Sequence, residues 1–228
     1  MTTFTDRSFD DADLRDIADG ADEPVVFVDC SFVKAFCEDG SLAGVRFERC
    51  DLEGTEFFDT DLTKVTFVGC TGNGPSFVRT DLSDATFEGC TLVDAKFTNS
   101  GVAGTTWRDC KLLSATFSNV SGIGWTIASS SLMYADVRGL DFEGKTLVGV
   151  DLSEANLERV NFSKAVFEDC RLSHANWKGA TFAGADIRGA DLGPLTNAES
   201  ITALRGAIIS QRQSHGLANA LGLVVVHD

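Results

Sequence analysis

A large residue recurs at every fifth position between Val25 and Leu192, and this period is the feature that most constrains the fold. An α-helix returns apolar residues about every 3.6 positions and a strand every second position, so neither regular structure has a period of five. Two positions before each large residue lies a small one, as Ala85 precedes Phe87. The pattern therefore predicts a chain that winds through short strands joined by tight corners.

The two positions after each large residue are expected to form the corners. Gly, Asp, Ser and Arg collect there, as in Glu53-Gly54, Ser83-Asp84 and Glu143-Gly144. Glycine adopts the unusual dihedral angles that a tight corner requires.

The cysteines indicate how many sides make one turn. Six of the seven occupy the small inward position at intervals of twenty residues or a multiple of twenty. They are Cys30, Cys50, Cys70, Cys90, Cys110 and Cys170. Twenty residues make four five-residue sides, so we predict a four-sided coil with one internal cysteine column. Evenly spaced thiols offer no preferred disulfide pairing, and buried thiols pack as small apolar groups.

Short motifs give the repeat a family resemblance. Ala-Asp-Leu at 190–192, Ala-Asn-Leu at 155–157 and Ala-Asn-Trp at 175–177 resemble the repeats of pentapeptide-repeat proteins. That resemblance implies an all-β fold, a right-handed quadrilateral β-helix, which we assign to residues 25–192.

Residues 1–24 are predicted to form a partial coil followed by an acidic loop or cap. Phe4, Phe9 and Leu14 keep the five-residue spacing, but thirteen residues separate Leu14 from Phe27, so the register breaks between them. An end cap would cover unpaired strand edges, which every solenoid must protect. A loop that contacts a partner is the alternative.

Residues 193–228 are predicted to form a C-terminal cap with a helix and a strand. Ser210 is a favourable helix N-cap, Gln211 to Leu221 read as a helix, and Gly222 is placed to end it. Apolar residues 223–226 follow as a β-prone segment. Exposed apolar surface of this kind is economically buried against a second copy of the chain. The predicted homodimer interface is Leu217, Ala218, Leu221, Leu223 and Val225.

The same C-terminal segment narrows the family resemblance. The run from Leu204-Arg205-Gly206-Ala207 to Leu223 is similar to the ending of Qnr and MfpA proteins. Membership of that group implies a dimer that binds DNA gyrase or topoisomerase IV, protects it from quinolones, and imitates duplex DNA with its acidic surface. The absence of loops between Phe27 and Leu192 resembles the MfpA type.

The charge is compatible with such mimicry. The formal net charge is −15, which argues against direct binding to nucleic acid. At a strand spacing of ~4.8 Å a dimer would be roughly 90 Å long, with a little over half the charge density of DNA. Ordinary solvated acidic surface remains the alternative. The candidate DNA-mimic surface is Asp51, Glu53, Asp61, Asp81, Asp84, Asp141, Glu143, Asp151, Glu154 and Asp191.

Two places depart from the repeat. Gly72 replaces a large inward residue and is followed by Pro75 in a small inward position, while Trp125 occupies a small position after Gly122. Lys145 lies twenty residues after Trp125, so we expect it to point outward or to lie over the indole ring. Local distortion and a partner-binding hot spot are both open interpretations.

No enzyme motif is present. The chain lacks a nucleophile elbow, a phosphate-binding loop and a dinucleotide fingerprint, and it has no Cys/His cluster with zinc spacing. We therefore expect no catalysis, cofactor, metal or small-molecule substrate. The sequence shows neither a signal peptide nor a membrane-spanning run, so a cytoplasmic location is expected. The two functional hypotheses are a DNA-mimicking topoisomerase binder and a non-catalytic scaffold for another protein.

Overall fold

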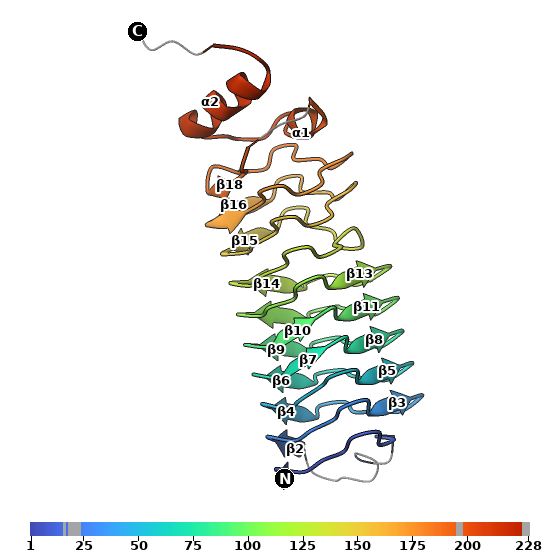
Figure 1. Ribbon diagram of the computed structural model, residues 1–228. Helices are drawn as coiled ribbons and strands as arrows, with labels where there is room; N and C mark the ends of the chain where they lie inside the picture. Colours follow the sequence, from blue (N-terminus) through green and yellow to red (C-terminus); the bar gives the residue numbers. More distant parts are fainter. Residues whose placement is uncertain (16, 18–23, 195–197, 225–228) are drawn as a thin grey trace. The chain divides into compact units, whose positions relative to one another are not determined.

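The computed structural model describes residues 1–15, 17, 24–194 and 198–224. Contacts group the chain into two compact units: unit 1 is Met1–Ser131 and unit 2 is Leu132–Asp228. In both units short parallel strands pair with strands twenty residues further along the chain, as Phe47 pairs with Phe67 and Leu147 with Phe167. Each unit is therefore built of four-sided coils (Figure 1), and the predicted quadrilateral β-helix is confirmed.

Three sides of unit 1 are parallel sheets. Sheet A contains β1 (Thr2–Thr5), β2 (Val25–Val28), β4 (Arg46–Glu48), β6 (Thr66–Val68), β9 (Thr86–Glu88), β12 (Thr106–Arg108) and β14 (Thr126–Ala128). Sheet B contains β7 (Thr71–Asn73) and β10 (Thr91–Val93). Sheet C contains β3 (Phe36–Glu38), β5 (Glu56–Phe58), β8 (Ser76–Val78), β11 (Lys96–Thr98) and β13 (Thr116–Ser118). The fourth side, called side D, is held by isolated bridges from Ser41 through Asp61 and Asp81 to Gly101.

Unit 2 has fewer regular strands and ends in two helices. In it β15 (Thr146–Val148) pairs with β16 (Val166–Glu168), and β17 (Cys170–Arg171) pairs with β18 (Ala190–Asp191). The helices are α1 (Ala198–Ala203) and α2 (Gln211–Ala220). Ser210 caps α2 and Leu221 ends it, so the predicted helix is confirmed with its end one residue earlier.

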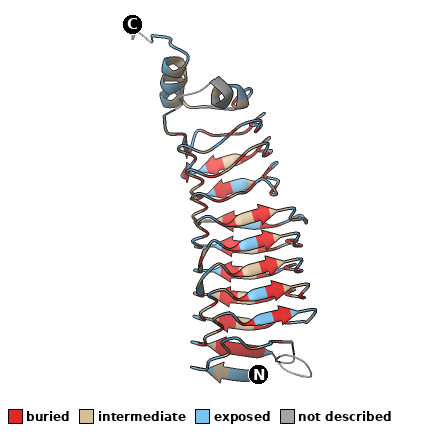
Figure 2. Ribbon diagram, turned by 45° about the vertical axis from the view of Figure 1, so that its right-hand side comes forward, coloured by how far each residue is buried: buried red, intermediate tan, exposed pale blue. Residues whose placement is uncertain are grey.

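The middle residue of every three-residue strand except β7 is buried and belongs to the core (Figure 2). In unit 1 the inward rings stack on the rings of the next coil: the centroids of Phe47 and Phe67 are 4.9 Å apart, and those of Phe77 and Phe97 are 5.0 Å apart. Such stacking adds to the free energy gained by burying large aromatic surfaces. The core of unit 1 therefore consists of columns of packed rings.

The cysteine column is confirmed as core packing. All seven cysteines are buried and free of disulfides. The Cys70 thiol donates to the carbonyl of Phe47 at 3.4 Å, and Cys90 makes the same contact with Phe67. Burial raises the pKa of Cys37 and of Cys170, so these thiols are held in their unreactive protonated form.

The corners lie where the sequence predicts them. Gly54, Asp84 and Gly144 have φ angles of 60°, 59° and 65°, in the left-handed region. Glycine, Asp and Asn adopt this conformation at lower cost than other residues. The sharp change in chain direction after every large residue follows from it.

The two irregular places are absorbed without a loop. A Cβ on Gly72 would lie 2.8 Å from the carbonyl carbon of Leu52, so this position requires glycine. Pro75 is buried, and its carbonyl accepts a hydrogen bond from the Lys96 N–H at 3.0 Å. Trp125 is buried in unit 1, and Lys145 is half-buried in unit 2. The expected contact between their side chains stays a prediction.

Both ends continue the coil pattern. Phe4 pairs with Phe27 across β1 and β2, which forms the partial first coil. Near the other end the Ile187 N–H donates to the Ile208 carbonyl at 3.0 Å, two residues further along than in the regular coils. Most of the predicted acidic loop at 16–24 and the end of the predicted strand, 225–226, lie outside the described residues. Leu223 and Val224 are in irregular structure, and the division into three functional regions stays a prediction.

Candidate functional site

Six of the ten candidate acids have a structural role at the corners. Each precedes a large inward residue, and its carboxylate accepts a hydrogen bond from the backbone N–H two residues later. The bond is 2.9 Å from Thr63 to Asp61 and 2.9 Å from Ser83 to Asp81. Asp51, Asp141, Asp151 and Asp191 make the same bond at 2.9 to 3.0 Å.

The corner bond does not require a negative charge. Asn161 Oδ1 accepts the N–H of Ser163 at 3.0 Å, and Asn176 Oδ1 accepts the N–H of Lys178 at 3.2 Å. An amide oxygen therefore closes the corner as a carboxylate does. The fold dictates an oxygen acceptor at these positions and leaves the charge free for another purpose.

Side D of unit 1 brings three candidate acids together. Asp61 and Asp81 are direct partners across neighbouring strands, and Asp84 follows at the exposed corner. Ser41 donates to Asp61 at 3.2 Å, but among the described residues none of the three carboxylates forms an ion pair. Like charges directly opposite each other on neighbouring strands are destabilising. Unit 1 therefore keeps an unneutralised acidic cluster here.

Asp51 and Glu53 occupy the side of unit 1 that includes sheet B. Asp51 lies between Ser31 and Thr71 in the ladder of bridges, so its neighbours along the ladder are uncharged. Glu53 is exposed. Within the described part of the chain neither carboxylate has a Lys or Arg at ion-pair distance.

The candidate acids of unit 2 are more often neutralised. Glu143 lies 3.4 Å from Lys164 Nζ, and Asp151 lies 3.8 Å from Arg171. Asp141, Glu154 and Asp191 complete the set and are exposed. The structure thus distributes the ten residues over both units instead of gathering them in one site.

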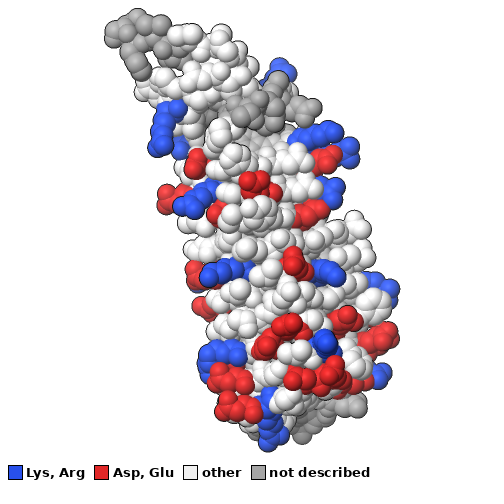
Figure 3. Space-filling model, in the orientation of Figure 1, with Lys and Arg blue, Asp and Glu red and all other residues white. Residues whose placement is uncertain are grey.

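The two units differ in net charge. Unit 1 has 22 acidic and 10 basic residues, a net charge of −12, whereas unit 2 has 12 and 9, a net charge of −3. Figure 3 shows acidic side chains gathered over the first coils of unit 1. Two acids outside the candidate set are paired with arginine at the surface. Hydrogen bonding from Arg49 lowers the pKa of Asp29, and hydrogen bonding from Arg188 lowers the pKa of Asp186.

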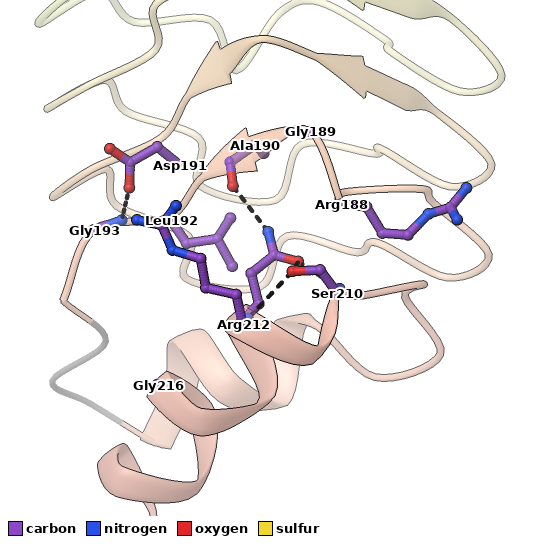
Figure 4. A pocket seen from close by; sticks show the side chains of 10 residues that line it. Arg188, Gly189, Ala190, Asp191, Leu192, Gly193, Ser210, Arg212 and Gly216 are labelled. Carbon is purple, nitrogen blue, oxygen red and sulfur yellow. Dashed lines mark hydrogen bonds between the residues drawn. The ribbon is translucent and has the colours of Figure 1, made fainter.

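Gln213 holds helix α2 on the last coil. Gln213 Nε2 donates to the carbonyls of Ile187 at 2.7 Å and Ala190 at 2.8 Å, while its Oε1 accepts the Ser210 N–H at 2.8 Å. Gln213 therefore closes the capping box and docks the helix. Figure 4 shows the adjoining hollow of about 480 Å³, which Arg188 and Arg212 line.

The predicted dimer residues form an incompletely covered apolar surface. Leu217 and Ala218 are half-buried, whereas Leu221 and Leu223 are 56% and 59% exposed. Val225 lies outside the described residues. Ile208 and Val224, which the sequence interpretation did not include, are exposed as well. The role of this surface in dimerisation stays a prediction.

Sequence reasoning missed a pair of outward-facing aromatic residues on sheet C. Phe36 is 39% exposed and Phe58 is half-buried, and both line a hollow of about 310 Å³. The guanidinium carbon of Arg79 lies 4.3 Å from the centroid of the Phe58 ring. The sequence does contain a signal for this pair. Phe36 directly precedes the inward Cys37 and Phe58 directly follows the inward Phe57, and positions next to an inward residue face solvent.

Two further features are absent from the described residues. No group of three His, Cys, Asp or Glu side chains is arranged to hold a metal ion there. No described helix is long and apolar enough to cross a membrane.

Comparisons with known proteins place the repeat in a family. A pentapeptide repeat region matches residues 40–117, and pentapeptide repeats in eight copies match residues 130–169 and 161–193. Together these matches cover more than half of the chain. No curated protein matches the sequence significantly.

Solved structures show the same fold. Full-length QnrB1, a plasmid-mediated fluoroquinolone resistance protein, aligns at a TM-score of 0.61 with 22% identity, over 97% of this chain and 100% of QnrB1. A trypsin-treated QnrB1 variant aligns at 0.55 with 24% identity, over 99% and 98% of the two chains. At this identity the likeness is one of fold. The repeat matches and the four-sided coils agree, and the chain belongs to the pentapeptide-repeat family.

Proposed function

We propose that this protein is a non-catalytic DNA mimic that binds a type II topoisomerase, either DNA gyrase or topoisomerase IV. Binding modulates the activity of the enzyme and protects it from quinolones or other gyrase poisons. The observation that carries the proposal is the set of unneutralised acidic residues on two sides of unit 1. Asp51 and Glu53 lie on the side that includes sheet B, and Asp61, Asp81 and Asp84 lie on side D.

The physical argument is electrostatic. Duplex DNA presents phosphates at regular spacing, and proteins that bind DNA answer with Lys and Arg. Asp61 and Asp81, which are partners on neighbouring coils ~4.8 Å apart, present negative charges at a comparably close spacing. A net charge of −12 on unit 1 attracts a basic DNA-binding surface at long range and speeds association.

The proposed active form is a homodimer joined through α2. The exposed Leu221, Leu223 and Ile208 support this, because a partner copy would remove them from water. We propose the cytoplasm as the site of action because the partner enzyme works on chromosomal DNA. Sedimentation of Leu217→Arg tests the interface: we expect a monomer, and an unchanged dimer would refute the assignment.

The function is tested by gyrase supercoiling assays with the purified protein titrated in, with and without a fluoroquinolone. We expect inhibition or drug protection at micromolar protein or below. The double variant Asp61→Asn/Asp81→Asn should weaken the effect several-fold, because it removes two charges and keeps the corner bonds. The effect should also weaken steeply as salt is added.

The matched control is Asp136→Asn in unit 2. Asp136 makes the same corner bond, to the Arg138 N–H, but it is already paired with the Arg138 guanidinium at 2.6 Å. Supercoiling assays should not distinguish it from wild type. No effect of the wild-type protein on gyrase or topoisomerase IV from several bacteria would reject the proposed function.

A scaffold for a different protein is the second candidate. The corner bonds favour this candidate, because they give six of the ten candidate acids a structural role that requires no topoisomerase. These six are Asp51, Asp61, Asp81, Asp141, Asp151 and Asp191. Salt-insensitive binding to gyrase would favour this candidate over mimicry.

A further inference from the structure

Sheet C of unit 1 has an unusual set of outward-facing side chains. Two of its ten outward positions carry aromatic rings, and both lie in the first two strands, β3 and β5. The outward residues in strand order are Phe36, Glu38, Glu56, Phe58, Ser76, Val78, Lys96, Thr98, Thr116 and Ser118. Aromatic and acidic residues thus occupy β3 and β5, while smaller or basic residues follow.

The four residues of β3 and β5 alternate in a checkerboard. Phe36 is the direct partner of Glu56, and Glu38 is the direct partner of Phe58. Each ring therefore lies beside a carboxylate on the neighbouring strand. These four residues, together with Ser76, surround the hollow of about 310 Å³. We call the four residues the sheet C patch.

The carboxylates of the patch are available to a partner. Glu38 and Glu56 are exposed, and among the described residues neither lies at ion-pair distance from a Lys or Arg. Two arginines near the patch are already paired with aspartates. Arg15 is paired with Asp13, and Arg79 Nε donates to Asp59 at 2.7 Å.

Arg79 shows what kind of group fits the rings. Its guanidinium lies over the Phe58 ring while it pairs with a carboxylate on the adjacent corner. A guanidinium can stack on an aromatic face and bond a carboxylate through the same planar group, whereas an ammonium is a compact, strongly hydrated charge. Phe36 also has a carboxylate beside it, that of Glu56. The patch itself contains no arginine that could bind to this ring and carboxylate.

We propose that the sheet C patch docks an arginine-bearing segment of a partner protein, with one guanidinium stacked on Phe36 and paired with Glu56 or Glu38. The inference goes beyond the proposed function because none of the ten candidate acids belongs to this patch. It holds for a topoisomerase or for another partner, so the two proposals can fail separately.

The test uses the full-length ¹⁵N-labelled protein and two synthetic peptides that alternate Thr with either Arg or Lys. We expect saturable amide shifts centred on residues 36–38, 56–58 and 76–79, with affinity for the Arg peptide at least about fivefold above that for the Lys peptide. Shifts spread evenly over all acidic surfaces, or equal affinity for both peptides, would overturn the proposal.

Variants locate the effect. Glu38→Gln/Glu56→Gln should reduce affinity for the Arg peptide at least about fivefold. The control Glu88→Gln/Asp109→Asn removes two exposed charges from unit 1 outside the patch. Its affinity for the Arg peptide should stay within twofold of the wild-type value. Equal loss in both variants would overturn the proposal in favour of non-specific attraction.

Phe36→Ser separates stacking from charge. This variant should abolish the preference for the Arg peptide over the Lys peptide. Its amide spectrum shows whether it remains folded. If it unfolds, the affinity of Glu38→Gln/Glu56→Gln for the Arg peptide decides whether the proposal stands. Sedimentation without peptide tests whether the patch binds a second copy of this chain instead. A wild-type dimer that dissociates in Glu38→Gln/Glu56→Gln would show that the patch binds a second copy of this chain, and would overturn the proposal.

Discussion

The two units share one coil geometry and differ in the charge of their surfaces. Where unit 1 closes corners with Asp51, Asp61 and Asp81, unit 2 uses Asn161 and Asn176 in addition to aspartates. The same backbone bond is made in each case. Net charges of −12 and −3 on equivalent scaffolds therefore indicate that the acidity of unit 1 is not a requirement of the fold.

The cores differ as well. Unit 1 contains two columns of stacked rings, which include Phe47, Phe67 and Phe87 on sheet A. In unit 2 the column is shorter, with Phe162 between Phe142 and Phe182. Both cores thus contain packed aromatic rings, and they differ in the length and number of the ring columns.

The largest expected effect tests whether the units unfold separately. Phe77→Ala in unit 1 and Phe162→Ala in unit 2 each remove a fully buried ring that packs against rings of the coils before and after it, so each should cost about 3–5 kcal/mol of unfolding free energy. Hydrogen exchange followed by mass spectrometry should show faster exchange mainly in the mutated unit. Equal acceleration in both units would mean that they unfold as one.

A smaller effect is expected at the end of unit 2. Gln213→Ala removes the capping contact and the two bonds to the Ile187 and Ala190 carbonyls, so α2 should lose about 1–3 kcal/mol. The rate of amide hydrogen exchange in residues 211–220 measures this loss of stability. Gln211→Ala, at the exposed first position of the same helix, should change the exchange rate little. If both variants behave alike, Gln213 does not hold the helix in place.

The corner bonds give the next comparison. Asp81→Ala in unit 1 and Asn161→Ala in unit 2 should each lose about 0.5–1.5 kcal/mol in urea unfolding, because a backbone N–H loses its acceptor. Asp81→Asn should be as stable as wild type within a few tenths of a kcal/mol. A clear destabilisation by Asn would show that the charge itself has a structural role.

The smallest effect concerns pH. Hydrogen bonding from Arg138 holds the pKa of Asp136 below its usual range. A lowered pKa in the folded state adds stability above the unfolded pKa of about 3.9, and this stability is lost as pH falls through the folded value. Asp136→Asn should therefore lose a few tenths of a kcal/mol at pH 7 and nothing at about pH 2. A difference that grows on acidification would contradict this sign.

Much of the fold could be predicted because it repeats. Inward residues such as Phe77 and Cys70 must return at the same place in every coil, so a one-dimensional period carries the three-dimensional packing. The cap and end of α2 were readable for a related reason, since Ser210 and Gly222 act on neighbouring backbone groups.

The candidate site was less predictable, because it depends on pairs of residues about twenty positions apart and on the direction of their side chains. Glu143 pairs with Lys164, and Asp59 pairs with Arg79. Each pair forms because the two residues lie at corners of neighbouring coils and their side chains extend toward each other. The sequence shows charges of both signs at those positions without showing which of them neutralise each other.

The sequence by itself determined the four-sided coil, its cysteine column and the terminal helix, because period and local capping are properties of consecutive residues. Only the tertiary structure decided that Glu143 pairs with Lys164, that Gly72 leaves no room for a Cβ beside Leu52, and that Phe36 meets Glu56 on sheet C. Those features arise where one coil lies against the next, and a side chain's neighbours there are set by packing between coils.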